Sequence, residues 1–318
     1  MDVEPVATDV ASASTSERRE RSGLVGLLSD YLTLTKPPII SLLLVTAIGG
    51  MFLASRHMGG SGIPDLLTML LVCVGGSLGA GGANAINHYM DQDIDSLMSR
   101  TAKRPVPGHR VRPLAALAFG IGLNVAAFAV LAYWVNLLAA GLTLAATLFY
   151  VLVYTGWLKR STPHNIVIGG AAGSIPPVVG WVAVAGTFDL PALYLFTIIF
   201  FWTPPHFWAL SLLIQGDYER AGIPMLPVVA GTEKTVGSIF VYSLVLVALT
   251  LVFAATGAVG LLYLGAAAFL GTAFVWAAWR LRQDISRRKA RNLYLYSLLY
   301  LALLFGAMMA DGVYRWWV

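Results

Sequence analysis

Repeated apolar runs, separated by short polar segments, constrain this chain more than any other feature of its sequence. Hydrophobic residues make up 58% of the 318 positions and charged residues only 12%, a balance that excludes a water-soluble globule. A helix needs about 20 apolar residues to cross a bilayer, and it pairs its backbone polar groups internally. We therefore predict an all-α membrane protein with nine transmembrane helices. The predicted spans lie at approximately residues 38–56, 65–90, 113–134, 137–155, 165–185, 190–214, 236–255, 258–279 and 292–311.

The basic residues predict the orientation of these spans, because cytoplasmic loops collect Lys and Arg. Two long runs are divided, at residues 134–136 and 256–257, to give nine spans. With a cytoplasmic amino terminus, 19 of the 21 Lys and Arg residues then fall inside, and only Arg56 and Arg315 fall outside. We therefore expect a bacterial plasma (inner) membrane protein whose amino terminus and active-site loops are cytoplasmic and whose carboxyl terminus is outside. The net charge of +5 reflects this orientation and indicates no nucleic-acid partner.

The first 30 residues are rich in Ala, Ser, Thr and mixed charge, and we expect residues 1–30 to form a disordered cytoplasmic tail. They contain acidic residues and lack an apolar core, which argues against a signal or transit peptide. Residues 31–318 are expected to form one nine-helix transmembrane domain. The single cysteine, Cys73, excludes an intrachain disulfide.

An acidic segment, NHYMDQDID at residues 87–95, ends the second apolar run. On a helix, Asn87, Asp91 and Asp95 lie on one face, which we call the acidic face, whereas Asp93 points elsewhere. Mg²⁺ prefers carboxylate and carbonyl oxygens and usually shares its coordination with a substrate phosphate. A solvated helix end is the simpler explanation for acidic residues, but ionisable groups at a membrane boundary favour function.

Basic residues flank the acidic face in the predicted cytoplasmic loops. Arg binds phosphate through two parallel hydrogen bonds, and Lys binds it as a point charge. The bias of cytoplasmic loops towards positive charge explains such residues equally well. The residues expected to bind a diphosphate are Lys36, Arg100, Lys103, Arg104, Lys159 and Arg160.

The sixth span carries a histidine among aromatic residues and is followed by a further acidic residue, Asp217. His206 lies 11 residues before Asp217, so on a straight helix both face one cavity, with His206 roughly 16 Å deeper. Pro176 and Pro177 are expected to break the fifth span, and broken helices in a membrane indicate a cavity. A buried histidine among aromatics is more often a hydrogen-bonded core residue, but burial in a membrane favours function. The residues expected to line an acceptor or carbocation pocket are His206, Tyr154, Trp202, Phe207 and Trp208.

Two acidic sites and several basic residues beside an aromatic-lined cavity suit an amphiphile with a diphosphate head, such as an isoprenyl diphosphate. The spacing of Asn87, Asp91 and Asp95 resembles the first aspartate-rich motif of the UbiA superfamily of intramembrane prenyltransferases, whose nine-helix fold agrees with the expected spans. Longer strings resemble the haem O branch of that superfamily, and the resemblance covers about residues 31–315. These strings are DQDIDSLMSRTAKRP from residue 91, LKRSTPHNI from residue 158, WTPPHFWAL from residue 202 and DYERAGIPMLP from residue 217.

One position departs from the wider superfamily. Its second motif usually has two aspartates four residues apart, whereas here Asp217 is followed at that spacing by Ala221. This departure fits the haem O branch.

The resemblance implies transfer of a farnesyl group from farnesyl diphosphate to a vinyl group of haem B, with addition of water, to give haem O for respiratory terminal oxidases. It implies that haem B is a substrate and that a haem A synthase or oxidase assembly proteins are partners. Mg²⁺ would neutralise the departing diphosphate with help from the basic residues, and aromatic faces would stabilise an allylic cation. The implied catalytic residues and metal ligands are Asn87, Asp91, Asp95 and Asp217.

Two alternatives stay open. A UbiA-type enzyme that prenylates an aromatic acid or quinone precursor shares the diphosphate site and differs only in its acceptor contacts. A cation-coupled membrane transporter would also carry acidic residues and broken helices. The acidic residues of this chain crowd one membrane face beside Arg and Lys, which suits a phosphate group better than a path through the membrane.

Overall fold

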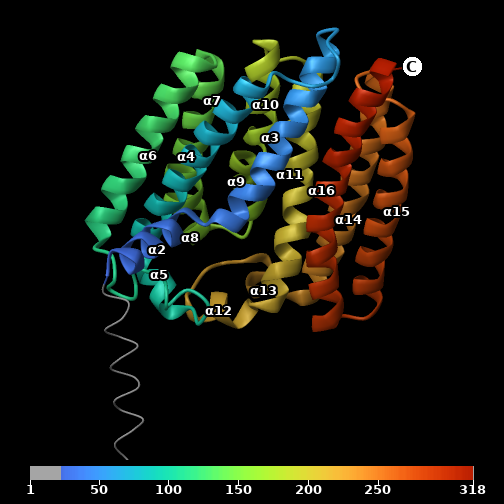
Figure 1. Ribbon diagram of the computed structural model, residues 1–318. Coiled ribbons are helices and arrows are strands. Elements are labelled where there is room, and N and C mark those ends of the chain that lie inside the picture. Colours follow the sequence, from blue (N-terminus) through green and yellow to red (C-terminus); the bar gives the residue numbers. More distant parts are fainter. Residues whose placement is uncertain (1–22, 318) are drawn as a thin grey trace, which may run out of the picture.

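The computed structural model describes residues 23–317, and Figure 1 shows a bundle of long helices with short helices gathered at one end. Within residues 23–317, nine helices are long and apolar enough to cross a membrane, which confirms the predicted all-α membrane fold and its nine spans. The chain is therefore an integral membrane protein. The spans are α3 (Pro37–His57), α4 (Leu66–Met90), α6 (Pro113–Trp134), α7 (Leu137–Leu148) continued through η1 (Phe149–Leu158) and α8 (Lys159–Ser161), α9 (Asn165–Gly173) with α10 (Ile175–Ala185), α11 (Leu190–Leu213), α14 (Gly231–Phe253) with η2 (Ala254–Thr256), α15 (Leu261–Gln283) and α16 (Arg287–Trp317).

Short helices gather at the lower end of the bundle in Figure 1. They are α2 (Leu24–Thr35), α5 (Gln92–Leu97), α12 (Gln215–Arg220) and α13 (Leu226–Val229). Most of the predicted tail, residues 1–30, lies outside the described residues, but its last part belongs to α2. Asp30 pairs with Arg110 at 2.9 Å, and Tyr31 packs edge-on against Phe119 of α6. These contacts hold α2 in place, so helical structure begins before the predicted boundary at residue 31.

Both divisions of the long apolar runs appear in the structure where the sequence predicts them. α6 ends at Trp134, and Asn136 caps the following helix because its side-chain oxygen accepts a hydrogen bond from the Ala139 N–H at 2.8 Å. Gly257 follows η2 with φ 74°, a left-handed conformation that glycine adopts without strain. Each division therefore has a local cause that is visible in the sequence.

Two spans contain irregular helix. The fifth span breaks at Ser174, two residues before Pro176, so the break lies beside the proline pair as predicted. The Ser174 hydroxyl donates to the Gly170 carbonyl at 2.9 Å. The fourth span contains the π-helix η1, which the sequence did not predict. π-helical segments occur frequently at functional sites, and η1 faces the junction of α4 with α5 through Thr155.

The bundle closes because the first span meets the last. α3 packs against α4, α10 and α16, and α16 in turn packs against α11 and α15. The crossing of α3 and α10 is close enough to require glycine on both helices. A Cβ atom on Gly180 would overlap the Ala47 carbonyl, and a Cβ atom on Gly50 would overlap the Pro177 carbonyl. Small residues allow such close approach of helices in a membrane.

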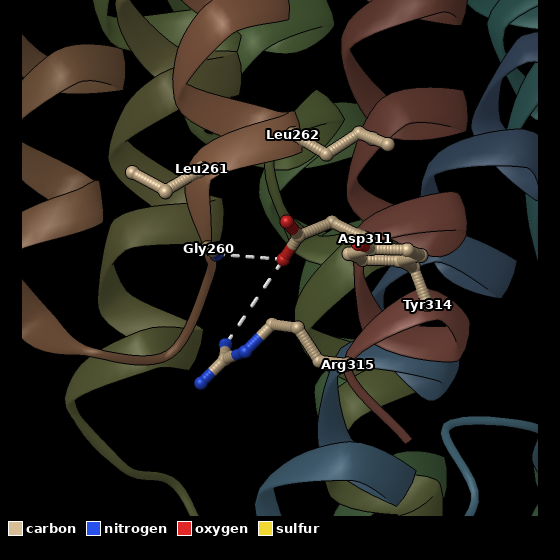
Figure 2. Close-up of a pocket in the computed structure, with 6 residues that line it drawn as sticks. All are labelled: Gly260, Leu261, Leu262, Asp311, Tyr314 and Arg315. Carbon is tan, nitrogen blue, oxygen red and sulfur yellow. Dashed lines mark hydrogen bonds and ion pairs between the residues drawn. The ribbon is translucent and has the colours of Figure 1, made fainter. Parts of the chain in front are cut away.

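A pocket of about 350 Å³ lies between the start of α15 and the end of α16 (Figure 2), at the end of the bundle away from the short helices (Figure 1). Asp311 of α16 accepts a hydrogen bond from the Gly260 N–H at 2.6 Å and lies 4.0 Å from the Arg315 guanidinium (Figure 2). Arg315 also donates to the Ala258 carbonyl at 3.1 Å, and Arg56 donates to the Arg315 carbonyl at 3.4 Å. The Asp311 carboxylate thus caps the start of α15, and we interpret this pocket as a joint between helices.

Candidate active site

The acidic face lies at the junction of α4 and α5. α4 ends at Met90 and α5 begins at Gln92, but helical hydrogen bonds continue through the junction. The Asp91 N–H donates to the Asn87 carbonyl at 2.9 Å, and the Asp95 N–H donates to the Asp91 carbonyl at 2.7 Å. The side chains of Asn87, Asp91 and Asp95 are buried, and these residues expose only 4%, 0% and 2% of their surface.

Asn87 links the acidic face to two other parts of the bundle. Its amide nitrogen donates to Asp91 Oδ2 at 2.6 Å and to Thr155 Oγ1 of η1 at 3.2 Å. Its amide oxygen accepts a hydrogen bond from Lys36 Nζ at 3.0 Å. Because one side of an amide donates and the other accepts, these contacts fix the orientation of the Asn87 side chain.

Two of the predicted basic residues form ion pairs shorter than 3 Å with the buried carboxylates. Lys159 Nζ lies 2.6 Å from Asp91 Oδ2, and Arg104 Nη1 lies 2.7 Å from Asp95 Oδ2. Removal of either cation would leave a buried carboxylate without its partner, which is costly inside a protein.

Lys36 brings a third cation to the same place. It stands between α2 and α3 with φ 55°, a left-handed backbone conformation that is uncommon for residues other than glycine. Burial, together with the positive charges of Arg104 and Lys159, lowers the pKa of the Lys36 ammonium group to about 7. An anion bound among these three cations would stabilise the charged form of Lys36.

The second acidic position, Asp217, is joined to the loop that follows the acidic face. The Ser99 hydroxyl lies 2.9 Å from Asp217 Oδ1 and 3.1 Å from Asp217 Oδ2, and Arg220 pairs with the same carboxylate. Ser99 was not among the site residues predicted from the sequence. A serine in a polar loop carries no sign that it meets a helix more than 100 positions away in the chain.

The chemistry of the acidic face fits a divalent cation. Asp91 Oδ1 is buried and lacks a hydrogen-bond partner among the described residues, and Arg160 Nη2 is 3.7 Å away. An unsatisfied buried carboxylate oxygen is a suitable ligand for Mg²⁺. Within residues 23–317, no three His, Cys, Asp or Glu side chains cluster closely enough to hold a metal ion by themselves. The structure therefore does not unite Asp217 with Asp91 and Asp95 in one cluster, and Mg²⁺ would need further oxygen ligands from a substrate.

The other predicted basic residues lie nearer the surface. Arg160 pairs with the exposed carboxylate of Asp93. Arg100 and Lys103 are exposed on the loop after α5, and the structure does not bring them against the acidic face.

The residues predicted for an acceptor pocket lie on different sides of α11. Trp202 and His206 pack towards α16, whereas Trp208 packs edge-on against Tyr242 of α14 at 5.3 Å. α11 ends at Leu213, and Asp217 lies on the separate helix α12. The prediction that His206 lies roughly 16 Å deeper than Asp217 assumed one straight helix through both residues. That assumption is wrong.

The remaining two aromatic residues lie elsewhere again. Tyr154 of η1 stacks on Tyr150 at 5.5 Å, and a Cβ atom on Gly169 of α9 would overlap the Tyr154 ring. Phe207 is half-buried against the main apolar core. The structure thus does not gather the five predicted residues into one pocket.

Sequence relatives share most of this chain. A model of the UbiA prenyltransferase family matches residues 43–310. The Protoheme IX farnesyltransferase of Roseiflexus sp. (strain RS-1) is 52% identical over 291 residues, which cover 92% of this chain and 54% of that relative. The Protoheme IX farnesyltransferase of Gloeobacter violaceus (strain ATCC 29082 / PCC 7421) is 50% identical over 300 residues, which cover 93% of this chain and 97% of that relative. The chain thus spans about half the length of the Roseiflexus relative and nearly all of the Gloeobacter relative.

Solved structures share the fold at low sequence identity. A digeranylgeranylglyceryl phosphate synthase has a TM-score of 0.72 at 19% identity, covering 91% of this chain and 99% of that chain. A UbiA homolog from Archaeoglobus fulgidus bound to DMAPP and Mg²⁺ has a TM-score of 0.63 at 17% identity, covering 88% of this chain and 99% of that chain. The arrangement of the nine spans described in residues 23–317 is therefore that of the UbiA fold.

Proposed function

This chain belongs to the UbiA prenyltransferase family, and on that premise we propose that it transfers a farnesyl group from farnesyl diphosphate to a vinyl group of haem B. The observation that carries the proposal is the burial of Asp91 and Asp95 beside three cations at one end of the bundle. Paired carboxylates with nearby Lys and Arg suit a diphosphate that arrives with its own divalent cation. The names of the curated relatives support haem as the acceptor.

Asn87, Asp91, Asp95 and Asp217 would supply protein oxygens to Mg²⁺. When bound, Mg²⁺ would neutralise charge that develops on the departing diphosphate. The UbiA homolog from Archaeoglobus fulgidus, which shares the fold of this chain, was solved with DMAPP and Mg²⁺, and this supports the choice of cation. A cation on the aspartates would release Lys159 and Arg104 from their present partners, and both side chains would then be available to the diphosphate oxygens.

The proposed reaction breaks the bond between C1 of the farnesyl group and a diphosphate oxygen, whose electron pair leaves with diphosphate. The allylic cation that remains forms a carbon–carbon bond with the vinyl group, and addition of water supplies a hydroxyl group and releases a proton. Half-buried aromatic rings near the site, such as Tyr150 and Tyr154, would exclude water until that bond has formed.

The same proposal places the acidic face on the cytoplasmic side, because the basic residues that surround it follow the positive-inside rule. A haem A synthase or oxidase assembly proteins are the proposed protein partners. A transporter is not favoured, because the buried carboxylates are neutralised by Lys and Arg at one end of the bundle. A quinone or aromatic acceptor is not favoured, because the curated relatives are named for a haem acceptor.

Purified full-length protein in lipid nanodiscs tests this function. We expect diphosphate release with farnesyl diphosphate, haem B and Mg²⁺ together, and a haem product whose mass increases by one farnesyl group and one hydroxyl group. Omission of haem B is the matched control and should abolish release. Release that depends on 4-hydroxybenzoate rather than haem would establish the aromatic alternative. Cation uptake into sealed vesicles without diphosphate release would establish the transporter.

A further inference from the structure

The imidazole ring of His206 stacks with two aromatic rings. The Trp202 indole stacks on one side, with ring centres 4.3 Å apart and an angle of 15° between the planes. Tyr294 of α16 stacks on it as well, at 5.0 Å and 27°. The indole is itself fixed, because Trp202 Nε1 donates to the Ser297 carbonyl at 2.8 Å.

The hydrogen bonds of Ser297 determine which nitrogen of His206 carries the proton. His206 Nδ1 lies 2.6 Å from Ser297 Oγ, and Ser297 Oγ donates its hydrogen to the Tyr294 carbonyl at 2.6 Å. A hydroxyl group has one hydrogen, so Ser297 Oγ is the acceptor in its bond with the imidazole, and Nδ1 is the donor. No described charged side chain pairs with this ring, and the neutral form is the one that the protein interior stabilises. Nε2 therefore keeps its lone pair.

Nε2 is the nitrogen of this ring that remains available to bind a ligand. Among the described residues, no side chain or backbone group forms a hydrogen bond with Nε2, and His206 is only half-buried. The ring lies seven residues before the end of α11 at Leu213, which places it roughly 10 Å from that end. Ser297 lies ten residues after the start of α16 at Arg287, roughly 15 Å along that helix. Both depths lie within the membrane-spanning part of the bundle.

We propose that His206 Nε2 is an axial ligand for the iron of a haem substrate and that Ser297 is the positioning residue that fixes the ligating tautomer. This inference rests on the proposed function, since it names how that acceptor is held. Neutral imidazole is a common iron ligand, and such ligands are oriented by the hydrogen bond of their other nitrogen. The stacking of Trp202 and Tyr294 restricts rotation of the ring, so its lone pair has a fixed direction.

A purely structural role makes a different demand on the same residues. If this hydrogen bond served only to join α11 to α16, it would need a donor at position 206 and an acceptor at position 297. Such a role would not use Nε2. His206→Gln keeps an amide donor for Ser297 and removes the imidazole. Ser297→Thr keeps the hydroxyl acceptor, whereas Ser297→Ala removes it.

Ferric haem titration into the purified full-length protein in nanodiscs separates these roles, with the Soret band and the haem affinity as readouts. We expect His206→Gln to shift the Soret band and to weaken haem binding by more than tenfold, because iron loses a ligand. Metal-free protoporphyrin IX has no iron to ligate. The His206→Gln variant should therefore bind it with an affinity within about twofold of that of the parent protein. Ser297→Ala should weaken haem binding by about tenfold, and Ser297→Thr should restore it.

His57→Gln is the matched control. His57 also lies beside a tryptophan, with its ring centre 5.1 Å from that of Trp181, but it belongs to the opposite end of the bundle. We expect an unchanged Soret band and unchanged haem affinity in this variant.

An unchanged Soret band and haem affinity in folded His206→Gln protein would overturn the inference. If that variant does not fold, Ser297→Ala and Ser297→Thr decide the question: equal spectra and affinities overturn the inference, and a shift in the alanine variant alone supports it. Should the parent transfer farnesyl to haem while these spectra stay unchanged, the inference fails and the proposed function stands. If the parent neither binds haem nor uses it as an acceptor, the proposed function fails as well.

Discussion

Arg160 holds Asp93 away from the acidic face through two hydrogen bonds, from Nη1 to Oδ2 at 2.7 Å and from Nη2 to Oδ1 at 2.8 Å. The same guanidinium group donates to the Met90 carbonyl at 2.9 Å. The Asp93 side chain is 61% exposed, whereas that of Asp91 is fully buried. Asp93 therefore joins α5 to the end of the fourth span, and its carboxylate points away from the proposed cation site.

Substitution of the aspartates should separate these roles. Asp91→Asn and Asp95→Asn are expected to reduce diphosphate release by at least about 100-fold, because each removes an anionic ligand at nearly constant shape. Asp93→Asn should cost less than about fivefold, since it weakens only a surface ion pair. Activity is measured on purified variants whose membrane yield matches the parent. Equal losses at all three positions would contradict the side-chain directions described above.

Removal of divalent cations should weaken binding of an unreactive farnesyl diphosphate analogue, such as a thiodiphosphate. We expect the affinity to fall by at least about tenfold in EDTA and to recover with Mg²⁺, because the analogue loses the cation that joins it to the carboxylates. Calorimetry on the purified protein gives both affinities. The Asp91→Asn variant is the control and should respond little to EDTA. Equal affinity with and without Mg²⁺ in the parent would remove the case for a metal at the acidic face.

The bond between Ser99 and Asp217 should matter for activity. Ser99→Ala is expected to lower kcat/KM for farnesyl diphosphate about tenfold, because the buried Asp217 carboxylate loses a charge-assisted hydrogen bond. Ser99→Thr keeps the hydroxyl and should retain most of the activity. Ser96→Ala is the matched control, since among the described residues the Ser96 hydroxyl donates only to the backbone carbonyl of the exposed residue Asp93, at 2.6 Å. A loss in the control as large as that in Ser99→Ala would point to damage of the whole loop.

The sequence predicted those features that depend on local spacing. The nine spans follow from the length of each apolar run, and the shared face of Asn87, Asp91 and Asp95 follows from their four-residue spacing on a helix that continues through a junction. Asn136 and Gly257 mark the two divisions of long runs because each has a local role at a helix end.

Contacts between distant segments were not predictable in this way. Nothing in a single chain sequence indicates that Ser99 meets Asp217, or that Ser297 meets His206, because these pairs depend on which helices are neighbours. The placement of Trp208 is different. It lies two residues after His206, about 200° around a helix, so helical spacing alone separates the two side chains.

Close packing of α3 on α10 should make Gly180 intolerant of any side chain. Gly180→Ala is expected to lower the free energy of unfolding by more than about 1 kcal/mol, because its methyl group would overlap the Ala47 carbonyl. Gly173→Ala is the matched control: a Cβ atom there would meet no atom of the described residues within 4 Å, and alanine favours helix over glycine. Thermal unfolding followed by intrinsic fluorescence compares the two. A stable Gly180→Ala variant would contradict the helix approach described here.

The proposed orientation can be tested from outside intact cells. Single cysteines are placed at residues 102, 162, 232 and 286 in a Cys73→Ser background. Residues 102, 162 and 286 lie in loops and residue 232 lies in the first turn of α14, and the basic residues assign all four positions to the cytoplasm. Cysteines in place of Met58 and Phe188 are the positive controls, because both residues are exposed and belong to loops at the other end of the bundle. An impermeant thiol reagent added outside should label the two controls and leave the four cytoplasmic positions unlabelled.

The outcome of this labelling bears on the site as well as on the topology. Positions 102 and 162 flank the acidic face, since one follows α5 and the other follows α8. If cysteines at both positions resist the reagent in intact cells and react with it once the cells are opened, the diphosphate site lies on the cytoplasmic side. Labelling of all four positions and protection of both controls would invert the protein in the membrane and contradict the positive-inside assignment. Labelling of only some of the four would contradict the nine-span arrangement itself, because an odd number of spans lies between these loops and either control position.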